Sequence, residues 1–208
     1  MRLREGDEFL VFSGDGREWR ATVTSVAKAG MLASVSEIAR QAAALPLVVE
    51  AWCGLVRPNR FDWAIEKCVE AGADIVRPLL SEYAARGEGG SQNRQERWTR
   101  IAMEAAEQCG RLSLPVVEAP ARFEALLGQH RGALLLGDSA GRSWAETAPL
   151  LPLEGRVAVA VGPEGGFSPD ELAKARAKGA LLVSFGPNIL RTETAAVIAV
   201  GLVRSLGR

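Results

Sequence analysis

From Leu47 onward, short apolar runs alternate with segments whose apolar residues recur every three or four positions, and this alternation constrains the fold most. The run 156–162 (RVAVAVG) consists mainly of small and β-branched residues, as is typical of a strand buried on both faces. Strands that alternate with helices imply a mainly parallel sheet, because each helix returns the chain to the edge where the previous strand began. We therefore predict an α/β fold, a mainly parallel sheet flanked by helices.

Periodicity and capping residues predict the individual elements. Ser168, Pro169 and Glu171 form a complete helix start, with a Ser cap, Pro at the first helical position and an acid at the third. Asn93 and Glu96 suggest a similar start. Residues 84–92 lack periodicity and are expected to form a mobile loop. Strands are predicted at 47–55, 73–82, 114–119, 132–137, 156–162 and 180–186, and helices at about 60–71, 93–109 and 121–128, after Ser168, and from about Thr192.

The first 46 residues have a different pattern, with short β segments separated by turn residues. Gly14, Asp15 and Gly16 provide the positive φ angles of a tight hairpin. This segment is too short to bury a large core alone. The pair Leu45–Pro46 therefore marks a predicted boundary between a small β domain and the α/β domain.

Composition excludes several classes of protein. No apolar run approaches the roughly 18–20 residues of a membrane helix, and the charged start does not resemble a signal peptide, so we expect a cytoplasmic protein without a membrane partner. Cys53, Cys68 and Cys109 lack metal-ligand spacing and are expected to be reduced and mostly buried. The single histidine, His130, is expected at the surface in a loop. Neither a metal site nor a Ser-His-Asp triad is predicted.

The charge balance does not identify a partner. The chain has 25 basic and 25 acidic residues, and 21 of the basic residues are arginine. Arginine suits bidentate phosphate contacts, but a GC-rich genome also favours arginine codons. Charge alone therefore leaves nucleic-acid binding open.

Two glycine-bearing loops, GPEGGF (162–167) and FGPNILRTET (185–194), each follow a predicted buried strand. Loops at the carboxyl ends of parallel strands commonly bind ligands, and glycine lets a ligand approach the backbone. The first loop lacks the GK[ST] ending of a phosphate-binding P-loop, and a Rossmann fingerprint is absent. From the residues alone, GPEGGF is either a ligand loop or a tight turn.

Four ordered motifs resemble the bacterial 16S rRNA uridine-N3 methyltransferase family. VGPEGGFSPDEL (161–172) and FGPNILRTETAA (185–196) are similar to its two signature motifs. IEKCVEAGADIVRPLLSE (65–82) and ERWTRIAMEAAEQCGR (96–111) resemble two further segments, so the likeness extends over nearly the whole chain.

The resemblance implies a trefoil-knot (SPOUT) methyltransferase domain at 47–208 that binds S-adenosyl-L-methionine and forms a homodimer. A PUA-like β-barrel at 1–46 would grip RNA. The implied substrate is a uridine of the 30S subunit, at position 1498 in standard rRNA numbering. The chain departs from the family at three points. Members usually carry further residues before the RLREGD segment, so the barrel is expected to be partial, and Asn188 and Tyr83 replace arginines.

The resemblance and the chemistry together suggest site residues. Arg191 would stabilise the uridine anion, and Glu193 or Glu164 would accept the proton or orient the groups that accept it. Alternatively, Arg191 and Glu193 form a structural ion pair with Thr192 as the helix cap. The apolar residues Ile189 and Leu190 would face adenine, or pack in the core, or do both. The expected cofactor residues are Leu136, Gly137, Gly162, Pro163, Gly165, Gly166, Phe185, Gly186, Asn188, Ile189, Leu190 and Thr194, and the expected RNA contacts are Arg2, Arg4, Arg60, Arg97 and Arg111.

Several alternatives remain open at this stage. The arginines named for RNA could lie on solvated helix faces, Arg97 for instance with Glu96 nearby. Trp63 and Trp98 are expected in the core rather than as stacking platforms. The protein could also methylate another rRNA or tRNA base, or bind the ribosome as an assembly protein without turnover.

Overall fold

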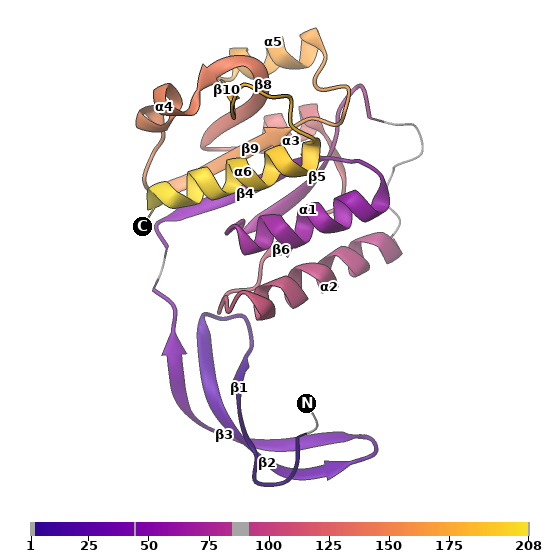
Figure 1. Ribbon diagram of the computed structural model, residues 1–208, viewed down its shortest axis with the longest axis vertical. Helices are drawn as coiled ribbons and strands as arrows, with labels where there is room; N and C mark the ends of the chain where they lie inside the picture. Colours follow the sequence, from indigo (N-terminus) through magenta and orange to yellow (C-terminus); the bar gives the residue numbers. More distant parts are fainter. Residues whose placement is uncertain (1–2, 44, 85–91, 208) are drawn as a thin grey trace. The chain divides into compact units, whose positions relative to one another are not determined.

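The computed structural model describes residues 3–43, 45–84 and 92–207 (Figure 1). The chain divides into two compact units, which are Met1–Ala44 with Ala106–Leu114 and Leu45–Ala105 with Pro115–Arg208. Arg2, a predicted RNA contact, lies outside the described residues. Most of the predicted mobile loop, residues 85–91, lies outside them as well.

The first unit contains an antiparallel three-stranded sheet. Its strands are β1 (Glu8–Phe12), β2 (Arg17–Ala27) and β3 (Gly30–Gln41), in the order β1-β2-β3. The predicted hairpin is confirmed, because β1 and β2 pair antiparallel and Gly14 and Gly16 between them have φ angles of +86° and +87°. The positive φ angle expected at Asp15 is wrong. The amide of Gly16 donates to the carbonyl oxygen of Leu112 at 3.0 Å, so a distant segment joins this sheet.

The second unit contains a sheet with the order β10-β8-β9-β4-β5-β6, in which β7 also pairs with β5 (Figure 1). Every strand pair in it is parallel, which confirms the predicted α/β class. Strand β8 continues beyond the predicted 132–137. The strands are β4 (Leu47–Gly54), β5 (Ile75–Leu80), β6 (Val116–Val117), β7 (Ala121–Arg122), β8 (Ala133–Ser143), β9 (Gly155–Val161) and β10 (Leu181–Ser184).

The helices begin close to their predicted starts. At α5, the Ser168 hydroxyl accepts from the Glu171 amide at 3.2 Å and the Glu171 carboxylate accepts from the Ser168 amide at 2.9 Å, so the predicted capping box is confirmed. The proposed Asn93 cap is wrong, because Asn93 already lies inside α2. The helices are α1 (Pro58–Glu70), α2 (Gln92–Gln108), α3 (Phe123–Gln129), α4 (Trp144–Thr147), α5 (Pro169–Ala177) and α6 (Thr192–Arg204), with 3-10 turns η1 (Ala148–Leu150) and η2 (Ser205–Gly207). None of the helices in the described ranges is long and apolar enough to cross a membrane.

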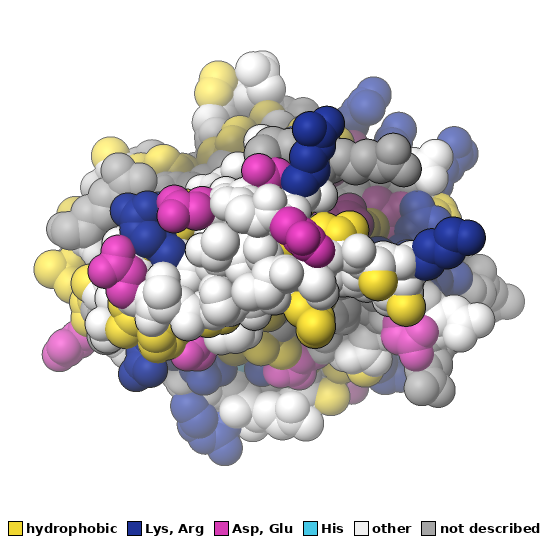
Figure 2. Space-filling view, turned by 90° about the horizontal axis from the view of Figure 1, so that it is seen from below, with side chains coloured by type: hydrophobic (Ala, Val, Ile, Leu, Met, Phe, Trp, Pro, Cys, Tyr) yellow, Lys and Arg dark blue, Asp and Glu magenta, His cyan; other side chains and the backbone are white. Residues whose placement is uncertain are grey.

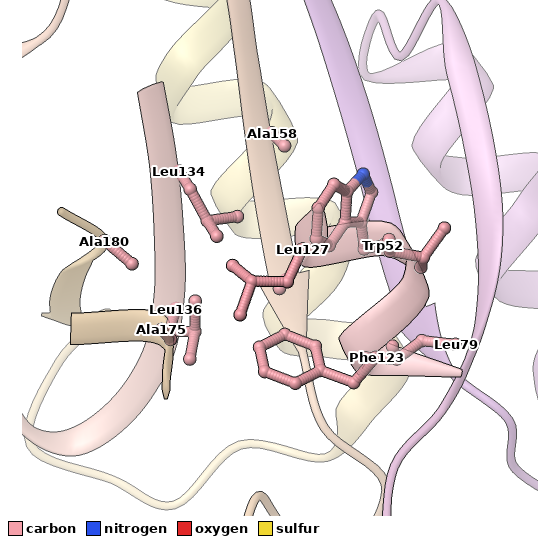
Figure 3. Close-up of a cluster of buried hydrophobic side chains, with 11 residues drawn as sticks. Trp52, Leu79, Phe123, Leu127, Leu134, Leu136, Ala158, Ala175 and Ala180 are labelled. Atoms are coloured by element: carbon pink, nitrogen blue, oxygen red, sulfur yellow. The ribbon is translucent and has the colours of Figure 1, made fainter. Parts of the chain in front are cut away.

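One face of the large sheet is covered by α3 and α5 (Figure 3). Trp52 of β4, Phe123 of α3 and Ala175 of α5 belong to one buried cluster, together with Leu79, Leu126, Leu127, Leu134, Leu136, Ala158, Ala160 and Ala180. Side chains alternate along a strand, so Val157 and Val159 of β9 point to the opposite face, where α6 packs against β4 and β9. The core of this unit therefore has two layers, one on each side of the sheet.

Helix α6 is tied to the sheet at its C-terminal end. The Arg204 guanidinium donates to the carbonyl oxygens of Leu47 at 2.8 Å and Gly72 at 2.7 Å and also pairs with Asp74. These contacts connect the last helix to the start of β4 and to the loop after α1.

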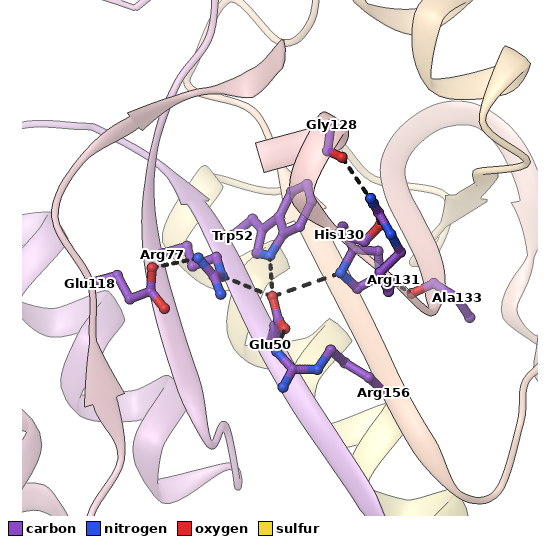
Figure 4. Close-up of polar contacts among 9 residues, drawn as sticks. All are labelled: Glu50, Trp52, Arg77, Glu118, Gly128, His130, Arg131, Ala133 and Arg156. Atoms are coloured by element: carbon purple, nitrogen blue, oxygen red, sulfur yellow. Dashed lines mark hydrogen bonds and ion pairs between the residues drawn. The ribbon is translucent and has the colours of Figure 1, made fainter. Parts of the chain in front are cut away.

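A buried ion network surrounds Glu50 of β4 (Figure 4). Its Oε2 accepts from Trp52 Nε1 at 2.8 Å and from Arg77 Nε at 2.9 Å, and Oε1 accepts from Arg156. The expected surface position of His130 is wrong, because its side chain is only 5% exposed, meets the Trp52 ring edge-on at 5.2 Å and lies 3.9 Å from Glu50. The helical pattern around 121–128 could not reveal this, since the contacts are with a strand far away in the sequence.

Burial of the other singled-out residues is mixed. Trp98 is buried against Phe61 at a ring distance of 4.8 Å, as expected, but Trp63 is exposed on α1. Cys53 and Cys68 are buried, whereas Cys109 is exposed. Periodicity identifies the buried face of a helix only approximately, because the neighbouring elements decide how wide that face is.

Candidate active site

A cavity of about 570 Å³ lies beside β8, where the two predicted glycine-bearing loops follow β9 and β10. Three segments form its wall. The first is residues 137–139 of β8, and the second is residues 161–167, at the end of β9 and in the GPEGGF loop. The third is residues 183–185 at the end of β10, residues 188–191 of the following loop, and Thr192 and Ala195 of α6. The wall therefore lies at the carboxyl ends of parallel strands, where ligands commonly bind.

Strand β8 enters the cavity because it leaves its register with β10. Leu136 of β8 pairs with Leu182 of β10, but the next residue of β10, Val183, pairs with Arg142 of β8. The residues between Leu136 and Arg142 are extra relative to β10, and such a bulge commonly redirects side chains beside a functional site. Asp138 and Ser139 thereby come to line the cavity, although no motif in the sequence singled them out.

Backbone packing requires glycine in the GPEGGF loop. A Cβ on Gly162 would lie 2.8 Å from the backbone carbon of Gly166, closer than real contacts allow. Gly166 itself has a φ of +68°, which most side chains avoid. The loop thus folds back on itself and presents main-chain groups along the cavity wall.

The two loops are joined by one buried hydrogen bond. The Thr192 hydroxyl donates to the carbonyl oxygen of Gly162 at 2.9 Å. The predicted helix cap at Thr192 is wrong, since Thr192 is the first residue of α6 and Arg191 occupies the cap position without a side-chain cap bond. The hydroxyl serves a tertiary contact instead of the local one.

The predicted catalytic residues lie in two settings. Arg191 and Glu164 both line the cavity, and the Glu164 side chain is 61% exposed. Glu193 is buried, with its side chain 10% exposed, and does not line the cavity. The alternative ion pair between Arg191 and Glu193 is absent from the described part of the chain. Glu193 instead lies 3.8 Å from Arg60.

Most of the predicted cofactor residues lie on the cavity wall. Leu136 instead belongs to the buried cluster of Figure 3, Gly186 lines an adjoining cavity of about 560 Å³, and Thr194 lies half-buried on α6. Ile189 is 93% exposed, so the alternative of simple core packing is wrong for it. Those on the wall are Gly137, Gly162, Pro163, Gly165, Gly166, Phe185, Asn188, Ile189 and Leu190.

The predicted RNA-contacting arginines are divided between the two units of the chain. Arg4 and Arg111 belong to the first unit, and Arg60 and Arg97 to the second. Arg97 pairs with Asp62 of α1 rather than with its helix neighbour Glu96. On the face in Figure 2, acidic and basic side chains are intermixed, and no continuous basic surface covers the described residues visible there. Within the described ranges, no group of three or more His, Cys, Asp or Glu side chains could hold a metal.

The sequence did not suggest that Arg60 lies beside the two candidate acids, Glu164 and Glu193. It stands in the first turn of α1, with Nη1 3.3 Å from Glu164 Oε1 and Nε 3.8 Å from Glu193 Oε1. The sequence provided only an indirect signal for this position, since both acids were already candidate catalytic residues. Their common neighbour comes from a helix more than a hundred positions earlier.

Comparisons with known proteins agree with this geometry. The RNA methyltransferase domain family matches residues 43–204, and the RNA methyltransferase PUA domain family matches residues 1–35. Ribosomal RNA small subunit methyltransferase E of Synechocystis sp. is 37% identical over 99% of this chain and 68% of that protein. The Bacillus subtilis protein of the same name is 32% identical over 98% of this chain and 83% of its own length. The structure of the Neisseria gonorrhoeae protein of that name, bound to S-adenosylmethionine, is 25% identical, covers 99% of this chain and 85% of that chain, and has a TM-score of 0.86.

Proposed function

The chain belongs to the RNA methyltransferase family that includes ribosomal RNA small subunit methyltransferase E, and on this premise we propose that it methylates N3 of a uridine in 16S rRNA of the 30S subunit. The observation that carries the proposal is the meeting of Arg191 and Glu164 on one cavity wall, between the two glycine-bearing loops. A cation and a carboxylate at a cofactor-sized cavity are what a proton-coupled methyl transfer needs.

The cofactor is S-adenosylmethionine, and the cavity fits it. A volume of about 570 Å³ lies within the usual range of ligand pockets, roughly 300–1,000 Å³. Phe185, Ile189 and Leu190 would offer apolar walls to adenine, and the glycine loop offers backbone hydrogen bonds. Asp138 adds a carboxylate, which suits a cofactor that carries positive charge. When bound, the cofactor supplies a methyl group activated by its sulfonium.

The chemistry assigns separate tasks to the two charged residues on the wall. N3 of uridine is a weakly acidic imide nitrogen, and it must lose its proton for its electron pair to form the N–C bond while the S–C bond breaks. Glu164 is the proposed proton acceptor, because it lines the cavity and its carboxylate is accessible. Arg191 supplies the positive charge that stabilises the uridine anion. The Glu193 side chain is buried next to Arg60 and does not line the cavity, which supports an indirect role for Glu193 in the reaction.

RNA binding and pairing of two chains complete the proposal. The small domain, residues 1–46, would bind RNA as a PUA-like domain, with Arg4 and, from the same unit, Arg111 at phosphates. Helix α6 leaves Ile198 37% exposed, with Val197 and Leu202 half-buried beside it. We propose that this apolar side of α6 pairs with a second copy of the chain, because a helix that is apolar nearly all round requires burial on most sides.

A methylation assay on small subunits tests the function. Subunits from cells that lack this gene are incubated with the protein and labelled S-adenosylmethionine, and the digested rRNA is analysed by nucleoside mass spectrometry. We expect 3-methyluridine in 16S rRNA, and no further incorporation in subunits from the parent strain. Label on another base, or in tRNA, contradicts the proposed substrate. Absence of transfer by protein that binds the cofactor contradicts the enzymatic activity.

A further inference from the structure

Arg60 faces two carboxylates that belong to different parts of the active site. Its Nη1 lies 3.3 Å from Oε1 of Glu164, in the GPEGGF loop, and its Nε lies 3.8 Å from Oε1 of Glu193, in the first turn of α6. Arg60 itself stands in the first turn of α1, where Pro58 begins the helix. One guanidinium therefore links three elements that are far apart in the sequence.

Glu164 and Glu193 differ in how deeply their side chains are buried. The Glu193 side chain is 10% exposed and the Glu164 side chain 61%, with Arg60 between them at 36%. Oε2 of Glu193 is buried without a hydrogen-bond partner, so within the described structure this acid relies on Arg60 for its charge contact. A buried charge is stable only when it is paired, whereas an exposed ion pair gains little. Glu193 thus holds Arg60 by charge from the buried side, whereas Glu164 accepts a hydrogen bond from Arg60 on the exposed side.

The exposed acid is the one that needs restraint. Glu164 lies in a loop with glycines at 162, 165 and 166, and without a partner its long, exposed side chain would have several rotamers open to it. A proton acceptor works only when it is held within hydrogen-bond reach of the proton. A guanidinium held from behind by a buried acid can supply that restraint at little further entropic cost, because it is already ordered.

We propose that Glu193 and Arg60 are positioning residues for methyl transfer, with Glu193 holding Arg60 and Arg60 holding the Glu164 carboxylate at the cavity mouth. This inference rests on the proposed function and deepens it. It also reassigns Arg60, which the sequence suggested as an RNA contact. Arg60 acts through Glu164 and does not itself touch the reacting atoms.

Steady-state kinetics of Arg60→Gln test the proposal. We expect kcat to fall by about ten- to a hundredfold, the scale of a misplaced catalytic group. KM for the small subunit and Kd for S-adenosylmethionine should stay within about twofold of the wild type, because the phosphate contacts and the cavity wall are intact. Arg60→Lys should recover part of the lost kcat. Arg57→Gln, which removes the same charge from an exposed position just before α1, is the matched control and should resemble the wild type.

A double variant, Arg60→Gln with Glu193→Gln, tests whether Glu193 and Arg60 both act through the carboxylate of Glu164. Glu193→Gln should lower kcat as Arg60→Gln does, and the double variant should be no slower than the slower single variant, because both act on the same carboxylate. The double variant also guards against misfolding, since it removes the buried charge that Arg60→Gln would leave unpaired. Multiplicative losses in the double variant would overturn the proposal.

Two further measurements separate the proposal from its rivals. If Arg60→Gln raises KM and weakens the salt dependence of RNA binding without changing kcat, Arg60 is a phosphate contact and the proposal fails. Amide hydrogen exchange of residues 164–166 without RNA should increase in Arg60→Gln and not in Arg57→Gln. Unchanged exchange overturns the positioning role even if the enzyme is active. Increased exchange in a protein that never methylates rRNA would reject the proposed function alone.

Discussion

Thr192 and Gly162 are joined by a buried hydrogen bond of 2.9 Å from the Thr192 hydroxyl to the Gly162 carbonyl oxygen. Thr192 opens α6 and Gly162 opens the GPEGGF loop, so this bond holds together the two segments that form most of the cavity wall. The hydroxyl of this first helical residue therefore links two loops. The shape of the proposed cofactor site depends on that link.

Thr192→Val should lower both stability and cofactor affinity. Valine keeps the shape of threonine but leaves the Gly162 oxygen buried without its donor, which typically costs about 1–3 kcal/mol. Thermal unfolding and isothermal titration with S-adenosylmethionine measure the two effects. Thr192→Ser keeps the hydroxyl and serves as the control. Equal behaviour of the valine and serine variants would show that the bond is dispensable.

Gly162→Ala should abolish cofactor binding in a protein that still folds in part. The added methyl would lie 2.8 Å from the Gly166 backbone carbon, so the loop must move. Gly128→Ala is the matched control, because a Cβ there meets nothing within 4 Å and the residue lies inside α3, where alanine gains up to about 1 kcal/mol. Differential scanning fluorimetry with and without cofactor distinguishes the two variants. Normal binding by Gly162→Ala would contradict the close approach.

Arg191→Ala should cut turnover by about a hundredfold or more, the scale of one lost preorganised electrostatic donor. Cofactor affinity should change little, because much of that wall is backbone. Arg111→Ala should instead weaken RNA binding and reduce its salt slope by about one counterion. Circular dichroism must first show that both variants fold. Near-normal turnover of Arg191→Ala on small subunits would end its catalytic assignment.

Glu50→Gln should destabilise the protein at neutral pH and flatten its acid response. Burial raises the pKa of the Glu50 carboxyl, but hydrogen bonds from Trp52 and Arg156 and the charge of Arg77 outweigh it, so the pKa lies below its ordinary value. The stability from this carboxylate is thus present above the unfolded-state pKa of about 4.3 and is lost as pH falls through the lower folded-state pKa. Breaking such a buried pair costs about 3–5 kcal/mol.

Urea denaturation at several pH values between 7 and 3 measures this effect. The wild type should lose more stability over that range than Glu50→Gln does. Glu37→Gln, at an exposed ion pair with Arg20, should differ from the wild type by no more than about 0.5 kcal/mol at neutral pH. Parallel losses in the wild type and Glu50→Gln would show that the network contributes no pH-dependent stability.

The protein should have the mass of a dimer by light scattering at tens of micromolar. Ile198→Glu places a charge on the exposed apolar side of α6 and should shift the mass to that of a monomer, because burying an unpaired charge at an interface is costly. Met103→Glu, at an exposed apolar residue of α2, should leave the mass unchanged. A monomeric wild type would contradict the proposed pairing.

Local patterns were sufficient for most of the secondary structure and for the region of the site. The apolar run 156–162 became β9, and the Ser168 and Glu171 pair capped α5, because both depend on neighbours a few residues away. The two glycine-bearing loops were placed at strand ends for the same reason. The prediction that Asn93 caps α2 was wrong, because residue propensity alone does not determine at which residue a helix begins.

The sequence by itself determined the α/β class, the order of most elements and the two loops that carry Glu164 and Arg191, since short-range periodicity and turn chemistry encode these. Only the tertiary structure decided that β8 leaves its register to bring Asp138 to the cavity, that His130 is buried against Trp52, and that Arg60 lies between Glu164 and Glu193. Each of these depends on contacts between residues far apart in the chain. Such contacts follow from how strands pair and helices pack, and they leave no periodic trace in the sequence.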